Sequence, residues 1–273
     1  MESGTQTTIS SHEAGVKCIE YCPSTVTLVS ASWDCTLQIH IPSNPTHVPN
    51  TIRLPSKPFA ISMSESKLVV AMASRILYIY DLKGLSLLAS QSSQPAPNEL
   101  EIEPWQKRES SLKFMTRAVA CMPKDAGYAS SSIEGRVAVE WFDPSAESQA
   151  RKYAFKCHRM QSNGSGPDAG DEGPVDIVYP VNALAFHPIH GTFASGGGDG
   201  IVALWDAIAK RRIRQYQRYP SSVATMDFSH DGKYLAIGIS PGFEDGQEDM
   251  AEGVVKLYVR ELGEAEAKSK GAK

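Results

Sequence analysis

The sequence predicts an all-β fold assembled from five repeated units of short antiparallel strands. Helical periodicity is nearly absent, whereas short segments that alternate apolar and polar residues recur between polar turns. The first strands of the five units begin at Val16, Pro58, Thr116, Val181 and Ser222, with spacings of 42, 58, 65 and 41 residues. The two short spacings match the ~40–45-residue unit of a four-stranded propeller blade, so we expect a β-propeller.

The two long spacings have a visible cause, because extra segments interrupt the repeat. Three segments rich in Pro, Gly, Ser or acidic residues are expected to be surface insertions or loops: 90–105, 161–174 and 242–253. We therefore expect a flexible N-terminus over 1–10, the propeller over 11–262 and a disordered tail over 263–273.

Composition places the chain among ordinary globular proteins, with 273 residues, 41% hydrophobic and 21% charged. Its net charge of −4 gives no global basic field, so we expect no direct binding of nucleic acid or membrane surface. No apolar run approaches the roughly 20 residues of a bilayer span, and the first residues lack the apolar stretch of a signal peptide. The five scattered cysteines indicate free thiols in a reducing compartment, cytosol or nucleus.

One unit carries a specific motif. In FASGGGDGIVALWD an Asp-Gly turn at Asp199-Gly200 precedes a strand that ends in Trp205-Asp206, which is the signature of the WD repeat. SASWDCTLQIH (30–40) and SRILYIYDLK (74–83) are weaker copies. The turn aspartates, Asp199 here and Asp34 in the first copy, are expected to be structural, holding adjacent groups by hydrogen bonds.

Three cations of the third unit are expected to meet at one rim. In a four-stranded meander, the first strand begins, the second ends, the third begins and the fourth ends on the same side. Arg117 opens the first strand, Arg136 follows the Glu134-Gly135 turn, and Lys156 lies near the end of the fourth. Such a cluster can hold a phosphate through charge-assisted hydrogen bonds. The alternative is that each cation merely pairs with a nearby acid, and the acids in question are Glu134, Glu140 and Glu109.

Several stretches of the chain resemble the Bub-type spindle-checkpoint WD-repeat family, the propeller partners of the Bub kinase and its Mad/BubR relatives. They are RESSLKFMTR, SSIEGRVAVE, KYAFKCHR, YPVNALAFHPIHGTFASGGGDG and YQRYPSSVATMDFSHDGKYLAIG. The resemblance runs from about residue 12 to about 260, broken at the insertions. That family has seven blades and the first unit here resembles its third, so we expect five blades that leave an unpaired edge, without the first two.

The resemblance implies a function. It implies that Arg117, Arg136 and Lys156 bind a phosphothreonine in repeated motifs of a kinetochore scaffold. It also implies that the same face binds a short motif of the Bub kinase and its paralogue, with Trp33 as a candidate contact; a tryptophan of the blade core is the alternative for Trp33. The implied locations are the nucleus, the kinetochore in mitosis and the cytoplasm.

Three other functions remain open. The mRNA-export WD-repeat family of the Rae/Gle type, which binds a nucleoporin, shares the SIEGRVA and FKCHR stretches. A truncated, nonfunctional copy is a second alternative, and a propeller enzyme is a third. No nucleophile elbow supports catalysis, and neither Cys18-x3-Cys22 nor Cys157-His158 has the second pair of a zinc site. We therefore expect a non-enzyme without metal or cofactor.

Overall fold

A computed structural model describes residues 8–42, 48–91, 99–162, 175–242, 255–263 and 265–268. The chain forms two compact units, Met1–Glu109 and Ser110–Lys273. None of the described helices is long and apolar enough to cross a membrane.

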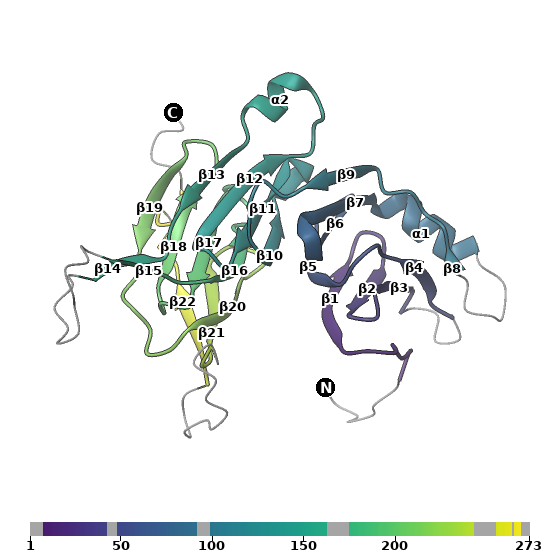
Figure 1. Ribbon diagram of the computed structural model, residues 1–273, viewed down its shortest axis with the longest axis horizontal. Helices are drawn as coiled ribbons and strands as arrows, with labels where there is room; N and C mark the ends of the chain where they lie inside the picture. Colours follow the sequence, from purple (N-terminus) through teal and green to yellow (C-terminus); the bar gives the residue numbers. More distant parts are fainter. Residues whose placement is uncertain are drawn as a thin grey trace. The chain divides into compact units, whose positions relative to one another are not determined.

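The first unit holds two blades, each with four antiparallel strands that follow one another in chain order (Figure 1). The first blade consists of β1 (Val16–Cys22), β2 (Thr27–Ser32), β3 (Thr36–His40) and β4 (Asn50–Arg53), with β8 (Glu99–Leu100) added parallel to β4. The second consists of β5 (Pro58–Met63), β6 (Lys67–Met72), β7 (Ile76–Asp81) and β9 (Gln106–Glu109), with the 3₁₀ turn η1 (Ala73–Arg75) before β7. A helix, α1 (Leu82–Gln91), follows β7.

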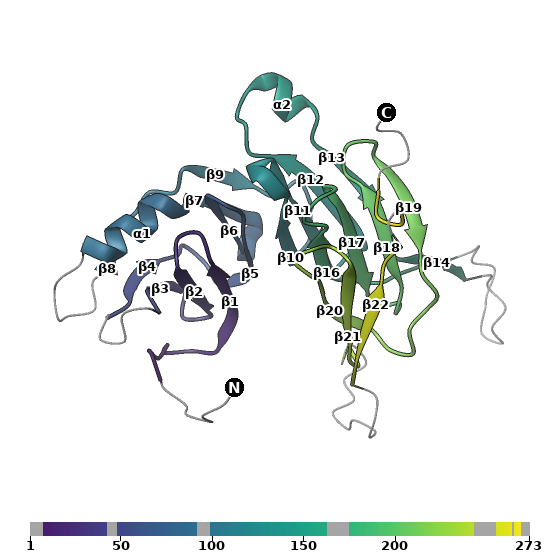
Figure 2. The same cartoon turned by 180° about the vertical axis from the view of Figure 1, so that it is seen from behind.

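The second unit holds three blades, and β16–β19 pack between the other two (Figures 1 and 2). One blade consists of β10 (Thr116–Cys121), β11 (Gly127–Ser132), β12 (Arg136–Trp141) and β13 (Tyr153–Lys156), with the 3₁₀ turn η2 (Pro123–Asp125) after β10 and α2 (Ala146–Ala150) before β13. The next consists of β16 (Val181–Phe186), β17 (Thr192–Gly197), β18 (Val202–Asp206) and β19 (Arg211–Gln215). The last consists of β20 (Val223–Phe228), β21 (Tyr234–Ile239) and β22 (Lys256–Glu261). A separate hairpin is made of β14 (Arg159–Ser162) and β15 (Val175–Val178).

Apolar alternation explains why these segments form blades. The middle strands β2, β6, β11 and β17 are buried almost throughout, because neighbouring sheets cover them. Small residues on these strands allow close packing. A Cβ atom added to Gly196 would lie 2.4 Å from Cγ1 of Val223 on the first strand of the following blade. Each unit accordingly has its own apolar core.

The first strand of every blade carries the same irregularity. The pairing register shifts just after the first residue, at Lys17, Phe59, Arg117, Asn182 and Ala224. A β-bulge of this kind bends the strand and re-aims the side chain at the extra position. Two of these five positions, Arg117 and Asn182, carry polar side chains of the candidate site.

The all-β fold with five blades is confirmed, and four of the five predicted strand starts are the observed ones; β20 begins at Val223, one residue later than predicted. The fifth blade differs from expectation, since three strands of it are described instead of four. The first predicted insertion, 90–105, is not all loop, because α1 ends and β8 forms within it. Most of 161–174 and nearly all of 242–253 lie outside the described residues. Within the tail expected to be disordered, Ala267 is buried and Thr192 Oγ1 donates to its carbonyl at 2.7 Å.

Candidate functional site

The predicted cations lie at the same end of the β10–β13 blade. Thr116 is paired with Ser132, Ser132 with Arg136, and Arg136 with Lys156, so one row crosses all four strands. Residues paired in this way project from the same face of a sheet, about 4.5–5.5 Å apart at Cβ. Arg117 follows Thr116 at the bulge of β10. The sheet therefore brings two cations directly opposite each other and a third to the same end.

A tight turn holds Arg136 at the start of its strand. Gly135 has a φ of +63°, and a Cβ atom there would lie 2.7 Å from the carbonyl oxygen of Cys157. Only glycine meets both conditions without strain. The Gly135 carbonyl in turn accepts a hydrogen bond from Cys157 N–H at 2.9 Å. The hairpin predicted at Glu134-Gly135 is thus confirmed, and the turn fixes where β12 begins.

The three cations have different partners. Arg117 is exposed, and its Nε and Nη2 donate to Oδ1 of Asn182 at 3.1 and 2.9 Å. Arg136 Nε lies 3.3 Å from Oε2 of Glu134, an ion-pair distance without the alignment of a hydrogen bond. The side chain of Lys156 is exposed, and its ammonium has no hydrogen bond or ion pair with any described residue. The expectation that each cation pairs with an acid therefore holds for Arg136 alone.

The other two acids considered as partners are engaged elsewhere. Glu140 is buried and accepts hydrogen bonds from Tyr128 Oη at 3.0 Å and Ser111 Oγ at 2.9 Å. Glu109 belongs to the first unit, where it pairs with Arg75 at 3.0 Å.

Two polar residues of this site were not foreseen. Asn182 occupies the bulge of β16, the position equivalent to Arg117 in β10, and its Nδ2 donates to Ser222 Oγ at 3.0 Å. Arg159 Nη2 donates to the carbonyl of Glu134 at 2.7 Å and so braces the turn before Arg136. An alignment of the repeats would have indicated Asn182, because VNALAF and TRAVAC share their pattern.

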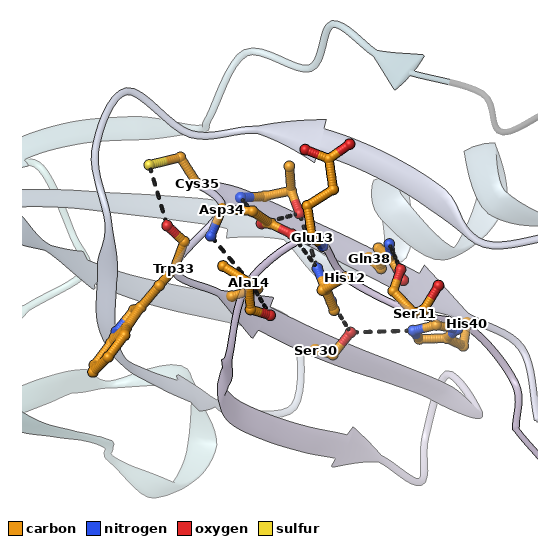
Figure 3. A network of polar contacts seen from close by, with 12 residues as sticks. Ser11, His12, Glu13, Ala14, Ser30, Trp33, Asp34, Cys35, Gln38 and His40 are labelled. Atoms are coloured by element: carbon orange, nitrogen blue, oxygen red, sulfur yellow. Dashed lines mark hydrogen bonds and ion pairs between the residues drawn. The ribbon is translucent and has the colours of Figure 1, made fainter.

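Trp33 lies in the first unit, in the turn between β2 and β3, and is 48% exposed. Figure 3 shows its ring directed away from the neighbouring polar side chains. The alternative of a blade-core tryptophan is therefore wrong, because a turn at the end of a sheet projects its side chain beyond the packed strands. An exposed aromatic side chain of this kind is available for contact with a partner.

The turn aspartates are structural, as predicted. In the first blade Asp34 accepts hydrogen bonds from His12 Nδ1 at 3.0 Å and from Thr36 N–H at 2.9 Å (Figure 3). Ser30 Oγ lies within hydrogen-bond distance of both His12 Nε2, at 2.9 Å, and His40 Nε2, at 3.2 Å, and so links the two imidazoles. Burial acts to raise the pKa of Asp34, but the hydrogen bonds from Thr36 and His12 outweigh it and lower that pKa.

The fourth blade repeats this network with a tryptophan in place of His40. Trp205 Nε1 donates to Ser195 Oγ at 2.8 Å, Ser195 donates to His158 Nε2 at 2.8 Å, and His158 Nδ1 donates to Asp199 at 2.9 Å. Trp205 lies on β18, Ser195 on β17 and His158 between β13 and β14. The relay therefore ties the turn that holds Asp199 to two strands and one connection of the second unit. His158 is thus a structural residue here. Across the described part of the chain, no group of three or more His, Cys, Asp or Glu side chains could hold a metal ion.

Comparisons with known proteins agree with this architecture. The family model described as "WD domain, G-beta repeat" matches residues 4–40 and 178–206. The β-propeller domain of Cps50 (Swd1) from Myceliophteria thermophila has a similar fold, with a TM-score of 0.57 over 91% of this chain and 72% of that one. Its sequence identity is 12%, so this likeness concerns the fold alone.

The sequence relatives are more specific. The mitotic checkpoint protein BUB3.1 of Arabidopsis thaliana is 41% identical over 98% of this chain and 72% of its own length. The mitotic checkpoint protein bub3 of Dictyostelium discoideum is 38% identical over 90% of this chain and 67% of its own. The mRNA export factor GLE2 of Chaetomium thermophilum is more distant, at 28% identity over 91% of this chain and 62% of its own. With five propeller blades, WD repeats and these identities, the chain belongs to the Bub3-type family of WD-repeat mitotic checkpoint proteins.

Proposed function

We propose that this chain is a non-enzymatic adaptor of the mitotic spindle checkpoint that binds a phosphothreonine motif of a kinetochore scaffold through Arg117, Arg136 and Lys156. The observation that supports it most is the pairing of Arg136 with Lys156. Like charges directly opposite each other destabilise a sheet. Such a pair is therefore unfavourable in the free protein and becomes favourable when an anion lies between the two side chains.

The local charges fit a doubly charged ligand better than a single carboxylate. Glu134 offsets part of the positive charge of Arg136, while Lys156 keeps all of its own. A phosphate carries about two negative charges near neutral pH, so it can compete with Glu134 and still pair with Lys156. Arg117 donates two hydrogen bonds to Asn182 Oδ1, and these contacts position its guanidinium before a ligand binds. Phosphorylation by a kinase would thereby switch binding on.

The partners in this proposal are the phosphorylated scaffold and checkpoint proteins of the Bub kinase and Mad/BubR type. The exposed Trp33 is the proposed contact for the short motif of the kinase and its paralogue. The proposed location is the nucleus, with the kinetochore in mitosis. Checkpoint relatives at 33–41% identity support this branch over mRNA-export relatives at 28% and 30%.

The test compares a phosphothreonine peptide with its unphosphorylated twin. For the wild type we expect a clear preference for the phosphorylated form. Arg136→Ala should weaken phosphopeptide binding about ten- to a hundredfold, since hydrogen bonds to charged groups contribute roughly 1.5–3 kcal/mol. Arg136→Lys should restore it only in part, because an ammonium lacks the bidentate fork. Lys156→Ala should also reduce the preference.

The matched control is Lys152→Ala, which removes an exposed lysine near the opposite end of β13. It should leave the preference unchanged. An equal loss with Lys152→Ala would mean that general charge, not this site, attracts the phosphate. Co-purification from dividing cells separates the two branches, with a checkpoint kinase expected and a nucleoporin as the contrary result.

A further inference from the structure

A chain of three polar side chains crosses three consecutive blades at the end that carries the candidate site. Arg117 of β10 donates to Oδ1 of Asn182 on β16 through Nε and Nη2, at 3.1 and 2.9 Å. Asn182 Nδ2 in turn donates at 3.0 Å to Oγ of Ser222, a buried residue directly before β20. A guanidinium has donors only, so the amide oxygen must face Arg117 and the amide nitrogen must face Ser222. The direction of the amide is therefore determined by its two partners.

The backbones that carry Arg117 and Asn182 are also tied to each other. Ser131 on β11 is fully buried, and its Oγ accepts a hydrogen bond from the Ala118 N–H at 3.2 Å and donates one to the Val181 carbonyl at 2.8 Å. Ala118 directly follows Arg117, and Val181 directly precedes Asn182. One hydroxyl thus links the two strands beside their bulges, so the two side chains extend from backbones at a fixed spacing.

The contacts with Asn182 use one edge of the Arg117 guanidinium and leave another free. The five N–H groups of a guanidinium lie in one plane, one at Nε and two at each Nη. Asn182 occupies the edge formed by Nε and Nη2, and Nη1 has no partner among the described residues. The edge formed by Nη1 and the second N–H of Nη2 therefore remains open. Two parallel N–H groups on one edge match two oxygens of a phosphate.

Asn182 also differs in charge from the partner of Arg136. Glu134 lies 3.3 Å from Arg136 Nε and offsets part of its positive charge. The neutral amide of Asn182 orients Arg117 without offsetting its charge. An exposed arginine that is already held in one orientation loses less conformational entropy when a ligand binds. Arg117 is thus both oriented and fully charged in the free protein.

We propose that Asn182 is a positioning residue of the phosphate site, which holds Arg117 so that its Nη1–Nη2 edge binds the phosphothreonine. The inference rests on the proposed function and deepens it. It assigns the residue that orients one of the three cations, and it names the edge of the guanidinium that the phosphate contacts. It also requires the side chain at this position to be neutral and to accept two hydrogen bonds.

Nuclear magnetic resonance of the arginine Nε–H groups tests this orientation without any peptide. In the wild type the Arg117 Nε–H should exchange with water much more slowly than that of Arg211, an exposed arginine of β19 whose side chain has no partner among the described residues. Asn182→Ala should remove the protection. Addition of a phosphothreonine peptide to the wild type should leave the Arg117 Nε–H protected, because the phosphate binds at the other edge.

Titration of the phosphothreonine peptide tests the consequence for binding. Asn182→Ala should weaken binding about two- to tenfold, because the released Arg117 must then be ordered when the peptide binds. Asn182→Asp keeps the shape of the amide but adds a negative charge, so it should keep Arg117 in place and still weaken binding. Salt distinguishes the two variants. The loss relative to the wild type should shrink at high salt for Asn182→Asp and stay constant for Asn182→Ala.

Gln149→Ala is the matched control, since it removes a side-chain amide that donates two hydrogen bonds at the opposite end of the same blade. It should leave peptide binding unchanged. A double-mutant cycle then identifies the residue through which Asn182 acts. In an Arg117→Ala background, Asn182→Ala should change binding less than about twofold, because no guanidinium is left to orient.

Three results would overturn the inference. The first is rapid exchange of the Arg117 Nε–H in the wild type, which would mean that Asn182 does not hold it. The second is loss of that protection when the phosphopeptide binds, which would mean that the phosphate displaces Asn182. The third is an equal effect of Asn182→Ala with and without Arg117, which would mean that Asn182 acts on the peptide by another route.

Failure of this inference is distinguishable from failure of the proposed function. Wild-type binding by Asn182→Ala together with weakened binding by Arg117→Ala would contradict the positioning role alone. Wild-type binding by Arg117→Ala would instead remove Arg117 from the phosphate site and contradict both.

Discussion

Gly135 links the fold of the third blade to the candidate site, and its replacement by alanine is the sharpest test of the turn. Two separate penalties are expected. A positive φ of 63° costs an alanine about 1–2 kcal/mol. The new Cβ atom would also lie 2.7 Å from the Cys157 carbonyl oxygen and 3.0 Å from that of Tyr179, so the backbone must shift. Overpacking of this kind typically costs about 1–3 kcal/mol. The free energy of unfolding should fall by about 2–5 kcal/mol in total.

Gly191 provides the matched control. Its φ is +65°, yet an added Cβ atom would meet no atom within 4 Å. Gly191→Ala should therefore cost about 1–2 kcal/mol, from the positive φ alone. The change in unfolded-chain entropy is the same for both variants and cancels in their difference. That difference, about 1–3 kcal/mol, measures the close approach at Gly135.

Urea unfolding of the wild type and both variants gives the two free-energy changes directly. A phosphopeptide titration completes the test, because a shifted turn displaces Arg136 and should weaken binding only in Gly135→Ala. Equal destabilisation by the two substitutions would refute the reasoning, since it would show that the contacts around Gly135 relax without resistance.

Two further predictions concern the polar contacts of the second unit. Ser195→Ala removes the hydroxyl that joins Trp205 and His158, which leaves the buried His158 Nε2 and the part-buried Trp205 N–H without this partner. The free energy of unfolding in urea should fall by about 2–4 kcal/mol, and a fall below about 0.5 kcal/mol would contradict the relay. Burial acts to raise the pKa of Glu266, but hydrogen bonds from Tyr216 and neighbouring groups outweigh it and lower that pKa in the folded chain. The stabilising effect of Glu266 is therefore present above its ordinary value of 4.5 and is lost as the pH falls through the folded value. Glu266→Gln should thus be less stable than the wild type at pH 7, and the gap should close on acidification; a gap that stays constant with pH would exclude the carboxylate as its source.

The sequence by itself determined the repeat and its turns. Strand alternation located the first strand of each blade, and the turn chemistry of Glu134-Gly135 and Asp199-Gly200 located the hairpins. These features depend on residues within a few positions of each other, whose backbone preferences and facing are set locally. For the same reason, the gathering of Arg117, Arg136 and Lys156 at one end of a blade followed from strand order alone.

Only the tertiary structure decided what those side chains contact. The sequence contained no local sign that Asn182, 65 positions away, would hold Arg117, or that His40 would take the place that Trp205 has in the fourth blade. It also led to a tail expected to be disordered, whereas Glu266 bonds to Tyr216 and Arg260. Each of these contacts joins segments far apart in the chain. Their geometry depends on how whole sheets pack and where strands bulge, and local residue preferences do not encode it.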